Sequence, residues 1–191
     1  MTGMGVILPA REWTPACEEL AEQVGENDEN DDELIIVCDT EDDEVMEYHD
    51  PPEVKVVASG EPTGCSGKCN AVATGIEETE SDIIILTDDD FEHGENWIRK
   101  VERKVEENGS LSTYPMFSSE DALGTVMEPV VVLFTLQIFA TKGAWGGTTA
   151  FRRDDVDIDS LIDELRQTVT DDILIGNHLN DITIDRSLAR V

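Results

Sequence analysis

Residues 81–92, which read SDIIILTDDDFE, constrain the fold of this chain more than any other stretch. Ile83 to Leu86 form a short, wholly apolar run, which is typical of a strand buried on both faces of a parallel sheet. After one threonine, three aspartates follow, Asp88, Asp89 and Asp90. Open α/β sheets bind ligands outside the carboxyl ends of their strands. The stretch therefore predicts an α/β fold whose functional site contains these carboxylates.

Acidic runs are common in this chain, so only the position of the aspartate triplet makes it informative. Asp and Glu supply 44 of the 191 residues, and at that content roughly two acidic triplets are expected by chance. For the other runs, 31–33 and 41–44, we expect solvated surface positions. The triplet differs because it stands at the end of a buried strand. Its oxygens suit Mg²⁺ or Mn²⁺, which in turn bind phosphate, so we predict a metal site there.

The net charge is −31, because only 13 lysines and arginines oppose the acids. The acids are interleaved with regular apolar segments, a pattern that indicates a folded protein with a carboxylate-coated surface. Such a surface suits a cytoplasm near molar salt, where the Debye length falls to about 3 Å and self-repulsion is screened. We therefore expect a halophilic source. At ordinary salt the same charge opposes binding to nucleic acid or anionic lipid.

The cysteines and the apolar stretches indicate the cellular compartment in which the protein is expected. The four cysteines, at positions 17, 38, 65 and 69, show neither a disulfide framework nor two pairs with zinc-site spacing, and reduced thiols in a cytoplasmic protein are expected. No signal peptide is recognisable. The most apolar stretch, 130–140, has 11 residues, against the roughly 20 that span a bilayer. Residues 120–140 are compatible with a helix against the core, the favoured reading, or against a membrane surface.

The first half of the chain alternates strand and helix signals. Strands are predicted at 5–8, 33–38 and 54–58, and a weak helix at 43–48. Thr14 and Pro15 begin a helix as N-cap and first helical residue, and Gly25 ends it. This alternation predicts a mostly parallel sheet flanked by helices in a single domain.

Lys68 follows the glycine-containing loop 60–67 at the start of a predicted helix that runs to Glu78. A lysine at a helix N-terminus is suited to binding phosphate. The spacing is not that of a P-loop, since Cys69 stands where that motif has Ser or Thr. The alternative is a solvated lysine. The scarcity of basic residues in this chain favours the functional interpretation.

The second half is predicted to be mixed. A helix is expected over 95–108 with four apolar residues inward, a strand over 111–117 and a helix over 154–166. A short helix follows at 173–179, with Thr170 or Asp171 as its cap. The inward residues of the first helix are Trp97, Ile98, Val101 and Val105.

The order of these segments resembles the glycosyltransferases of family 2 and of the ceramide-glucosyltransferase-like family 21. The matching segments, in order, are VILPAR, DELIIVCDTEDD, SGKCNAVATGI, SDIIILTDDDFE, WGGTTAFRR and TDDILIG. The resemblance covers nearly the whole chain and implies the GT-A fold, a Rossmann-like α/β domain. It also implies a nucleotide-binding half over 1–90 and a sugar and acceptor half over 91–191.

The resemblance implies a metal-dependent inverting transfer of a sugar from a UDP- or GDP-sugar to an acceptor hydroxyl, which in family 21 is on a lipid. Asp90, assisted by Asp88 or Asp89, is the expected ligand of Mn²⁺ or Mg²⁺ in a DxD motif. Asp172 is the expected general base, and Asp171 is the second residue expected to be catalytic. The donor is expected to contact residues of the remaining segments, namely Pro9, Arg11, Asp39, Lys68, Gly146 and Gly147. His178 is either a further metal ligand or a surface histidine.

Two departures from these families and two rival functions remain open. The chain has no tryptophan after Trp145, so it lacks the Gln/Arg-x-x-Arg-Trp motif, and it lacks the flanking membrane helices of family 21. Either the acceptor differs or a membrane part, which would make this chain membrane-peripheral, lies elsewhere. A partner subunit that binds nucleotide sugar without turnover is one rival. A nucleotidyltransferase is the other, and VILPAREWTP disfavours it because the expected glycine-rich basic loop is absent.

Overall fold

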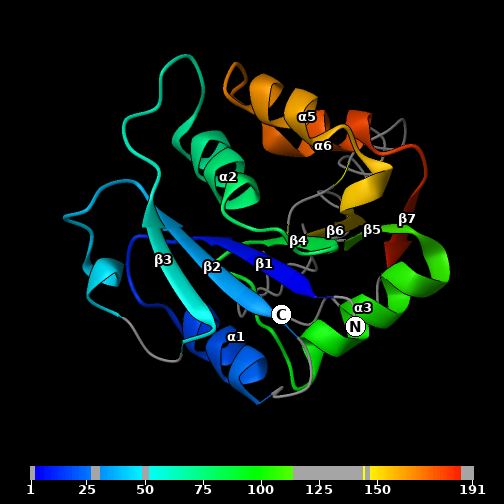
Figure 1. The fold of residues 1–191 in the computed structure, drawn as a ribbon, viewed down its shortest axis with the longest axis horizontal. Helices are drawn as coiled ribbons and strands as arrows, with labels where there is room; N and C mark the ends of the chain where they lie inside the picture. Colours follow the sequence, from blue (N-terminus) through cyan, green and yellow to red (C-terminus); the bar gives the residue numbers. More distant parts are fainter. Residues whose placement is uncertain (1–2, 27–30, 49–51, 114–143, 145–146, 186–191) are drawn as a thin grey trace, which may run out of the picture.

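The computed structural model describes residues 3–26, 31–48, 52–113, 144 and 147–185. Within these residues the chain is a single α/β domain, with a seven-stranded sheet between two layers of helices (Figure 1). The strands are β1 Met4–Pro9, β2 Glu33–Cys38, β3 Val54–Ala58, β4 Ile83–Thr87, β5 Ser110–Thr113, β6 Thr148–Arg152 and β7 Ile182–Asp185. The α-helices are α1 Pro15–Gly25, α2 Gly67–Glu77, α3 Trp97–Asn108, α5 Ile158–Leu165 and α6 Asp171–His178, and the 3₁₀ helices are η1 Glu44–Glu47 and η2 Arg153–Asp155.

The sheet is mostly parallel, as predicted, with the order β3-β2-β1-β4-β6-β5-β7. Only β6 is antiparallel to its neighbours, β4 and β5. The chain builds outward from β1 to β2 and β3 and then returns to place β4 on the other side of β1. The carboxyl ends of β1 and β4 therefore flank a topological switch point, the position where such sheets bind ligands.

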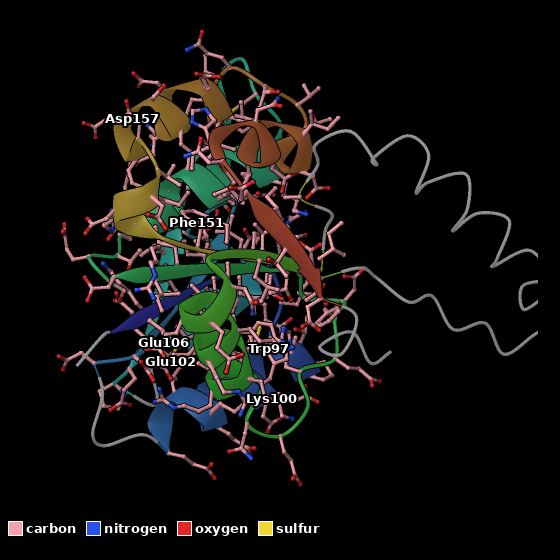
Figure 2. All side chains as sticks on the ribbon, turned by 90° about the vertical axis from the view of Figure 1, so that its right-hand side faces the viewer. Trp97, Lys100, Glu102, Glu106, Phe151 and Asp157 are labelled. Atoms are coloured by element: carbon pink, nitrogen blue, oxygen red, sulfur yellow. The ribbon has the colours of Figure 1, made fainter. Side chains whose placement is uncertain are left out.

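Alternate residues of the central strands enter two separate cores, which explains their continuous apolar runs. Ile83 and Ile85 pack with α1 and α3, whereas Ile84 packs with α2, α5 and α6. The large buried side chains Trp97 and Phe151 lie on opposite sides of the sheet (Figure 2). Burial on both faces holds β4 firmly, so the residues that follow it have a fixed position.

The predicted helix start at Thr14 is confirmed, because its hydroxyl accepts a hydrogen bond from the Cys17 N–H. The α2 helix has an equivalent cap in Ser66, which accepts from the Cys69 N–H and directly precedes the first turn with Lys68. The four inward residues predicted for α3 are all buried. Local capping chemistry and periodicity thus determined these boundaries.

Two secondary-structure predictions were wrong. The predicted helix 154–166 is divided, because Val156 and Asp157 are extended and Asp157 caps a helix that begins only at Ile158. The strand Ile182–Asp185 was missed; it pairs with β5 at the edge of the sheet, and the exposure of Ile184 weakens the alternation signal there. Of the predicted strand 111–117, residues 111–113 are in β5 and the rest lie outside the described residues, as does 120–140.

The expectation that acidic runs 31–33 and 41–44 are solvated surface was also wrong in part. Asp32 is 4% exposed, accepts a hydrogen bond from the Met4 N–H and pairs with Arg99. Glu33 accepts hydrogen bonds from Thr79 and Ser81. These carboxylates are satisfied by partners distant in sequence, which composition cannot reveal.

The four cysteines are free thiols, as expected. None of the helices in the described residues is long and apolar enough to cross a membrane.

Candidate active site

A cleft of about 750 Å³ lies at the carboxyl ends of β1, β2 and β4. Its volume falls within the range of small-molecule sites, roughly 300–1,000 Å³. Seven of the residues predicted from the sequence line it: Pro9, Arg11, Asp39, Lys68, Asp88, Asp89 and Asp90. The structure therefore brings together side chains from the first 90 residues at the switch point of the sheet.

A narrower recess adjoins the cleft and shares Pro9, Lys68 and Asp88 with it. The recess adds predicted residues from the other half of the chain, Gly147, Asp171 and Asp172. Gly146 lies outside the described residues. Two halves of the sequence thus meet at Lys68 and Asp88, with the aspartate triplet on one side and the start of α6 on the other.

Lys68 bridges these two sides. Its ammonium Nζ lies 2.8 Å from Asp88 Oδ1 and 3.3 Å from Asp171 Oδ2. Burial opposes the charge of the ammonium, but the Asp88 and Asp171 carboxylates outweigh it, so the pKa of Lys68 lies above its ordinary value. Lys68 therefore carries a permanent positive charge where the cleft meets the recess.

The charge of Lys68 compensates Asp89 of the same triplet only in part. Burial, followed by the neighbouring charge of Asp90, raises the pKa of Asp89. A bound cation would relieve this repulsion. Within the described residues no three histidine, cysteine or acidic side chains converge as a complete metal site. Mg²⁺ is commonly held by one or two carboxylates together with substrate phosphates, so Asp89 and Asp90 fit a divalent ion that binds with a phosphate ligand.

Asp43 organises the other wall of the cleft. It belongs to the acidic run 41–44, for which a surface position was expected. Asp43 Oδ2 accepts hydrogen bonds from the N–H groups of Asp39 and Thr40, at 2.9 and 2.8 Å. Its Oδ1 lies 3.2 Å from Nη2 of Arg11, whose Nε is also 3.5 Å from Asp39. The hydrogen bond from Thr40, opposed by desolvation and aided by Arg11, lowers the pKa of Asp43. The sequence signal for this role is the spacing of Asp43, four residues after the strand-end Asp39, because aspartate side chains accept hydrogen bonds from nearby backbone N–H groups in turns.

His178 is placed differently from the other predicted residues. Its Nε2 lies 3.5 Å from Glu164 Oε1, where α6 meets α5. It is absent from the linings of both the cleft and the recess. The structure does not bring His178 to the aspartate triplet.

Comparison with known proteins agrees with this architecture. Residues 6–155 match the sequence profile of Glycosyl transferase family 2, and the chain belongs to that family. No curated protein matches the chain.

Solved structures with a similar fold include glucosyl-3-phosphoglycerate synthase from Mycobacterium tuberculosis. Its complex with phosphoglyceric acid aligns with a TM-score of 0.56 and 13% identity, over 88% of this chain and 68% of the other. Its complex with Mn²⁺, uridine diphosphate and phosphoglyceric acid aligns with a TM-score of 0.55 and 15% identity, over 81% and 57%. At this identity the likeness establishes the GT-A fold.

Proposed function

We propose that this protein is a metal-dependent inverting glycosyltransferase that moves a sugar from a nucleotide-diphosphate sugar to an acceptor hydroxyl. The observation that carries the proposal is the junction of the cleft and the recess at Lys68 and Asp88. Strand-end carboxylates lie on one side of this junction and Asp172 on the other, which is the arrangement that transfer between a diphosphate and an acceptor requires. Membership of Glycosyl transferase family 2 supports this interpretation.

The cleft suits the nucleotide diphosphate. Asp39, on the loop held by Asp43, offers a carboxylate to the base or the ribose. Lys68 offers the charge that a diphosphate needs, as does Arg11. Mn²⁺ or Mg²⁺ held by Asp90 with Asp89 or Asp88 would act as a Lewis acid toward the leaving diphosphate. The similar Mycobacterium tuberculosis enzyme was solved with Mn²⁺ and uridine diphosphate, which supports the choice of ligand.

The sugar and the acceptor are expected beside the narrow recess, whose own volume is about 20 Å³, against the residues that line it. Asp172, in the first turn of α6, is our proposed general base. It takes the proton of the acceptor hydroxyl while that oxygen forms a bond to the anomeric carbon. The bond between this carbon and the diphosphate oxygen breaks, and its electron pair leaves with the nucleoside diphosphate. A single displacement of this kind inverts the anomeric configuration.

The proposal extends to the division of labour in the chain, with donor binding assigned to residues 1–90 and sugar and acceptor binding to 91–191. A UDP-sugar is the first donor to test, followed by a GDP-sugar, because the similar enzyme was solved with UDP-glucose. Acceptors to test are a phosphorylated hydroxy acid, after the same enzyme, and a lipid hydroxyl, after the family 21 resemblance. A halophilic source is proposed from the charge of −31.

Donor binding is tested by calorimetric titration with UDP in molar KCl, with and without Mn²⁺. We expect binding that requires Mn²⁺ and weakens at least about tenfold in Asp90→Asn, since a charged ligand group is lost. Glu92→Gln is the matched control, because it removes the same charge from an exposed residue outside the cleft. Equal affinity without metal and in Asp90→Asn would contradict a metal-assisted site.

Transfer is tested with labelled nucleotide sugars and a panel of acceptors. Asp172→Asn should lower kcat by about 10²–10⁴-fold, the usual contribution of a general base, while UDP affinity stays within twofold. Asp181→Asn, an exposed residue beyond the end of α6, is the control. Binding without transfer to any acceptor or water would indicate a non-catalytic partner subunit. Release of pyrophosphate would indicate a nucleotidyltransferase.

A further inference from the structure

A buried hydrogen-bonded relay lies directly behind the recess and involves a residue that the proposed mechanism does not use. Thr87, the last residue of β4, is 4% exposed. Its Oγ1 donates to the carbonyl oxygen of Gly147 at 2.7 Å and lies 2.8 Å from Nε2 of His93. The relay therefore joins the strand before the aspartate triplet to a residue 60 positions later in the chain.

The hydrogen count fixes the direction of the relay. A threonine hydroxyl has one proton, and Thr87 must give it to Gly147, because a carbonyl oxygen can only accept. His93 must then donate from Nε2, which requires a proton on that nitrogen. Nδ1 of His93 is buried and has no hydrogen-bond partner among the described residues. A proton on Nδ1 would be a buried donor without an acceptor, so the neutral imidazole with a bare Nδ1 is favoured.

Burial and aromatic contacts restrict the orientation of the His93 side chain. The imidazole is 2% exposed and contacts the rings of Phe91 and Trp97 edge to face, with centroids 5.3 and 4.5 Å away. Its backbone N–H donates to Glu19 of α1 at 2.8 Å. Burial, opposed by the charge of Asp88, lowers the pKa of His93 to about 4. The neutral ring, which contacts Phe91, Trp97 and Thr87, thus presents its Nε2–H to the Thr87 hydroxyl.

Gly147 also lies next to the ring of Phe91, a residue of the same segment as Thr87 and His93. Its φ of +103° suits glycine, and a Cβ added there would lie 3.2 Å from the ring of Phe91. The Gly147 carbonyl oxygen accepts hydrogen bonds from the hydroxyls of Thr87 and of the adjacent Thr148. Thr87 and Phe91 both belong to residues 87–93, the segment that also contains the aspartate triplet.

We infer that His93 is a positioning residue which, through Thr87, fixes the Gly147 wall of the recess relative to the aspartate triplet. This inference rests on the proposed function, since the sugar is expected to lie against the residues that line the recess. Thr87 and Gly147 line the recess, whereas neither lines the cleft. The relay should therefore affect the alignment of the reacting groups and leave nucleotide binding unchanged.

The test uses a matched pair at Thr87. Thr87→Val keeps the shape and removes the hydroxyl, whereas Thr87→Ser keeps the hydroxyl. We expect Thr87→Val to lower kcat about 10- to 100-fold, because a displacement near 1 Å has effects of this size. The Kd for UDP should stay within twofold, and Thr87→Ser should recover most of kcat. At His93, Gln should retain more activity than Leu, because its amide can donate near the position of Nε2.

A spectroscopic readout tests the relay without reference to turnover. In ¹⁵N NMR of the whole protein, His93 should show the neutral Nε2–H tautomer at pH 7, with a slowly exchanging proton that exchanges faster in Thr87→Val. An Nδ1–H tautomer, or a kcat in Thr87→Val equal to that in Thr87→Ser, would overturn the positioning role alone. A wild-type protein that binds UDP but transfers no sugar would overturn the proposed function as well.

Discussion

Lys68 and Arg11 both line the cleft of a chain with a net charge of −31, yet the structure holds them in opposite ways. The Lys68 side chain is 40% exposed and pairs with carboxylates from two separate elements, the end of β4 and the start of α6. The Arg11 side chain is 69% exposed, and its partners Asp39 and Asp43 belong to one loop.

A cation is positioned more firmly when separate elements of the fold hold it. Lys68 is fixed because moving it would break contacts with parts of the fold that are themselves rigid. Arg11 is itself largely exposed and contacts carboxylates of a single loop, and exposed ion pairs contribute only about 0–1 kcal/mol. We therefore expect Lys68 to act on the reaction and Arg11 mainly on donor capture.

Of the two cations, Lys68 should show the larger effect. Lys68→Met keeps the length of the side chain and removes its charge, and kcat/KM should fall about 10²-fold or more, as for other preorganised charge-stabilising groups. Steady-state kinetics with the nucleotide sugar that supports transfer in the assay measures this change in kcat/KM. Lys55→Met is the control, because Lys55 pairs with Glu78 and does not line the cleft. Equal losses in both variants would mean that net charge alone matters.

His93 differs from Lys68 because burial outweighs the charge of the nearby carboxylate, Asp88. Its pKa is lowered from 6.5 to about 4, so the unfolded chain binds the proton more readily than the folded protein does between these values. Stability is therefore highest above pH 6.5 and falls as the pH drops toward 4. Relative to His93→Gln, the wild type should lose about 2 kcal/mol of unfolding free energy between pH 7 and pH 5.

Denaturant titrations at both pH values measure this difference. Comparing the two proteins at each pH cancels the titration of the many carboxylates. An identical pH dependence in wild type and His93→Gln would contradict a neutral buried His93.

A smaller effect is expected at Arg11. Arg11→Ala should raise the KM for the donor by about fivefold or less, with kcat within twofold, since its ion pairs are exposed. The effect should shrink further as KCl is raised from 0.5 to 3 M, because salt screens exposed charges. Arg166→Ala, which breaks an exposed pair with Glu77 outside the cleft, is the control. A loss in kcat as large as that of Lys68→Met would remove the distinction between the two cations.

The smallest effect is expected at Asp43. Asp43→Asn weakens the hydrogen bonds to the Asp39 and Thr40 N–H groups, so UDP affinity should fall a few-fold. The lowered pKa of Asp43 means that its carboxylate stabilises the loop above about pH 3.8 and loses this role as the pH falls further. The Tm difference from wild type should therefore be constant from pH 7 to 5 and narrow below pH 4. Glu41→Gln, at an exposed residue of the same loop that does not line the cleft, should leave UDP affinity unchanged.

Much of the fold and part of the site could be predicted from the sequence. The strands at β1, β2, β3 and β4 are dense apolar runs, and Thr14 caps α1 through its own side chain, so each is encoded within a few residues. The strand-end positions of Asp39 and Asp88 follow from the same runs. These features are local, and a parallel sheet then brings the strand ends to one edge.

Which of the many acidic side chains form specific contacts depends on how the chain folds. Asp32, Asp43 and Asp89 stand in similar runs, yet Asp32 pairs with the half-buried Arg99, Asp43 builds the cleft wall, and Asp89 lies in the triplet, where burial and Asp90 raise its pKa. Their partners lie up to 67 residues away in the chain. The ion pair between Lys68 and Asp171, and the relay from His93 to Gly147, likewise depend on how the second half of the chain packs against the first. Sequence determined the elements because their signals are short-range, whereas the site required packing, which sets the distances between charges.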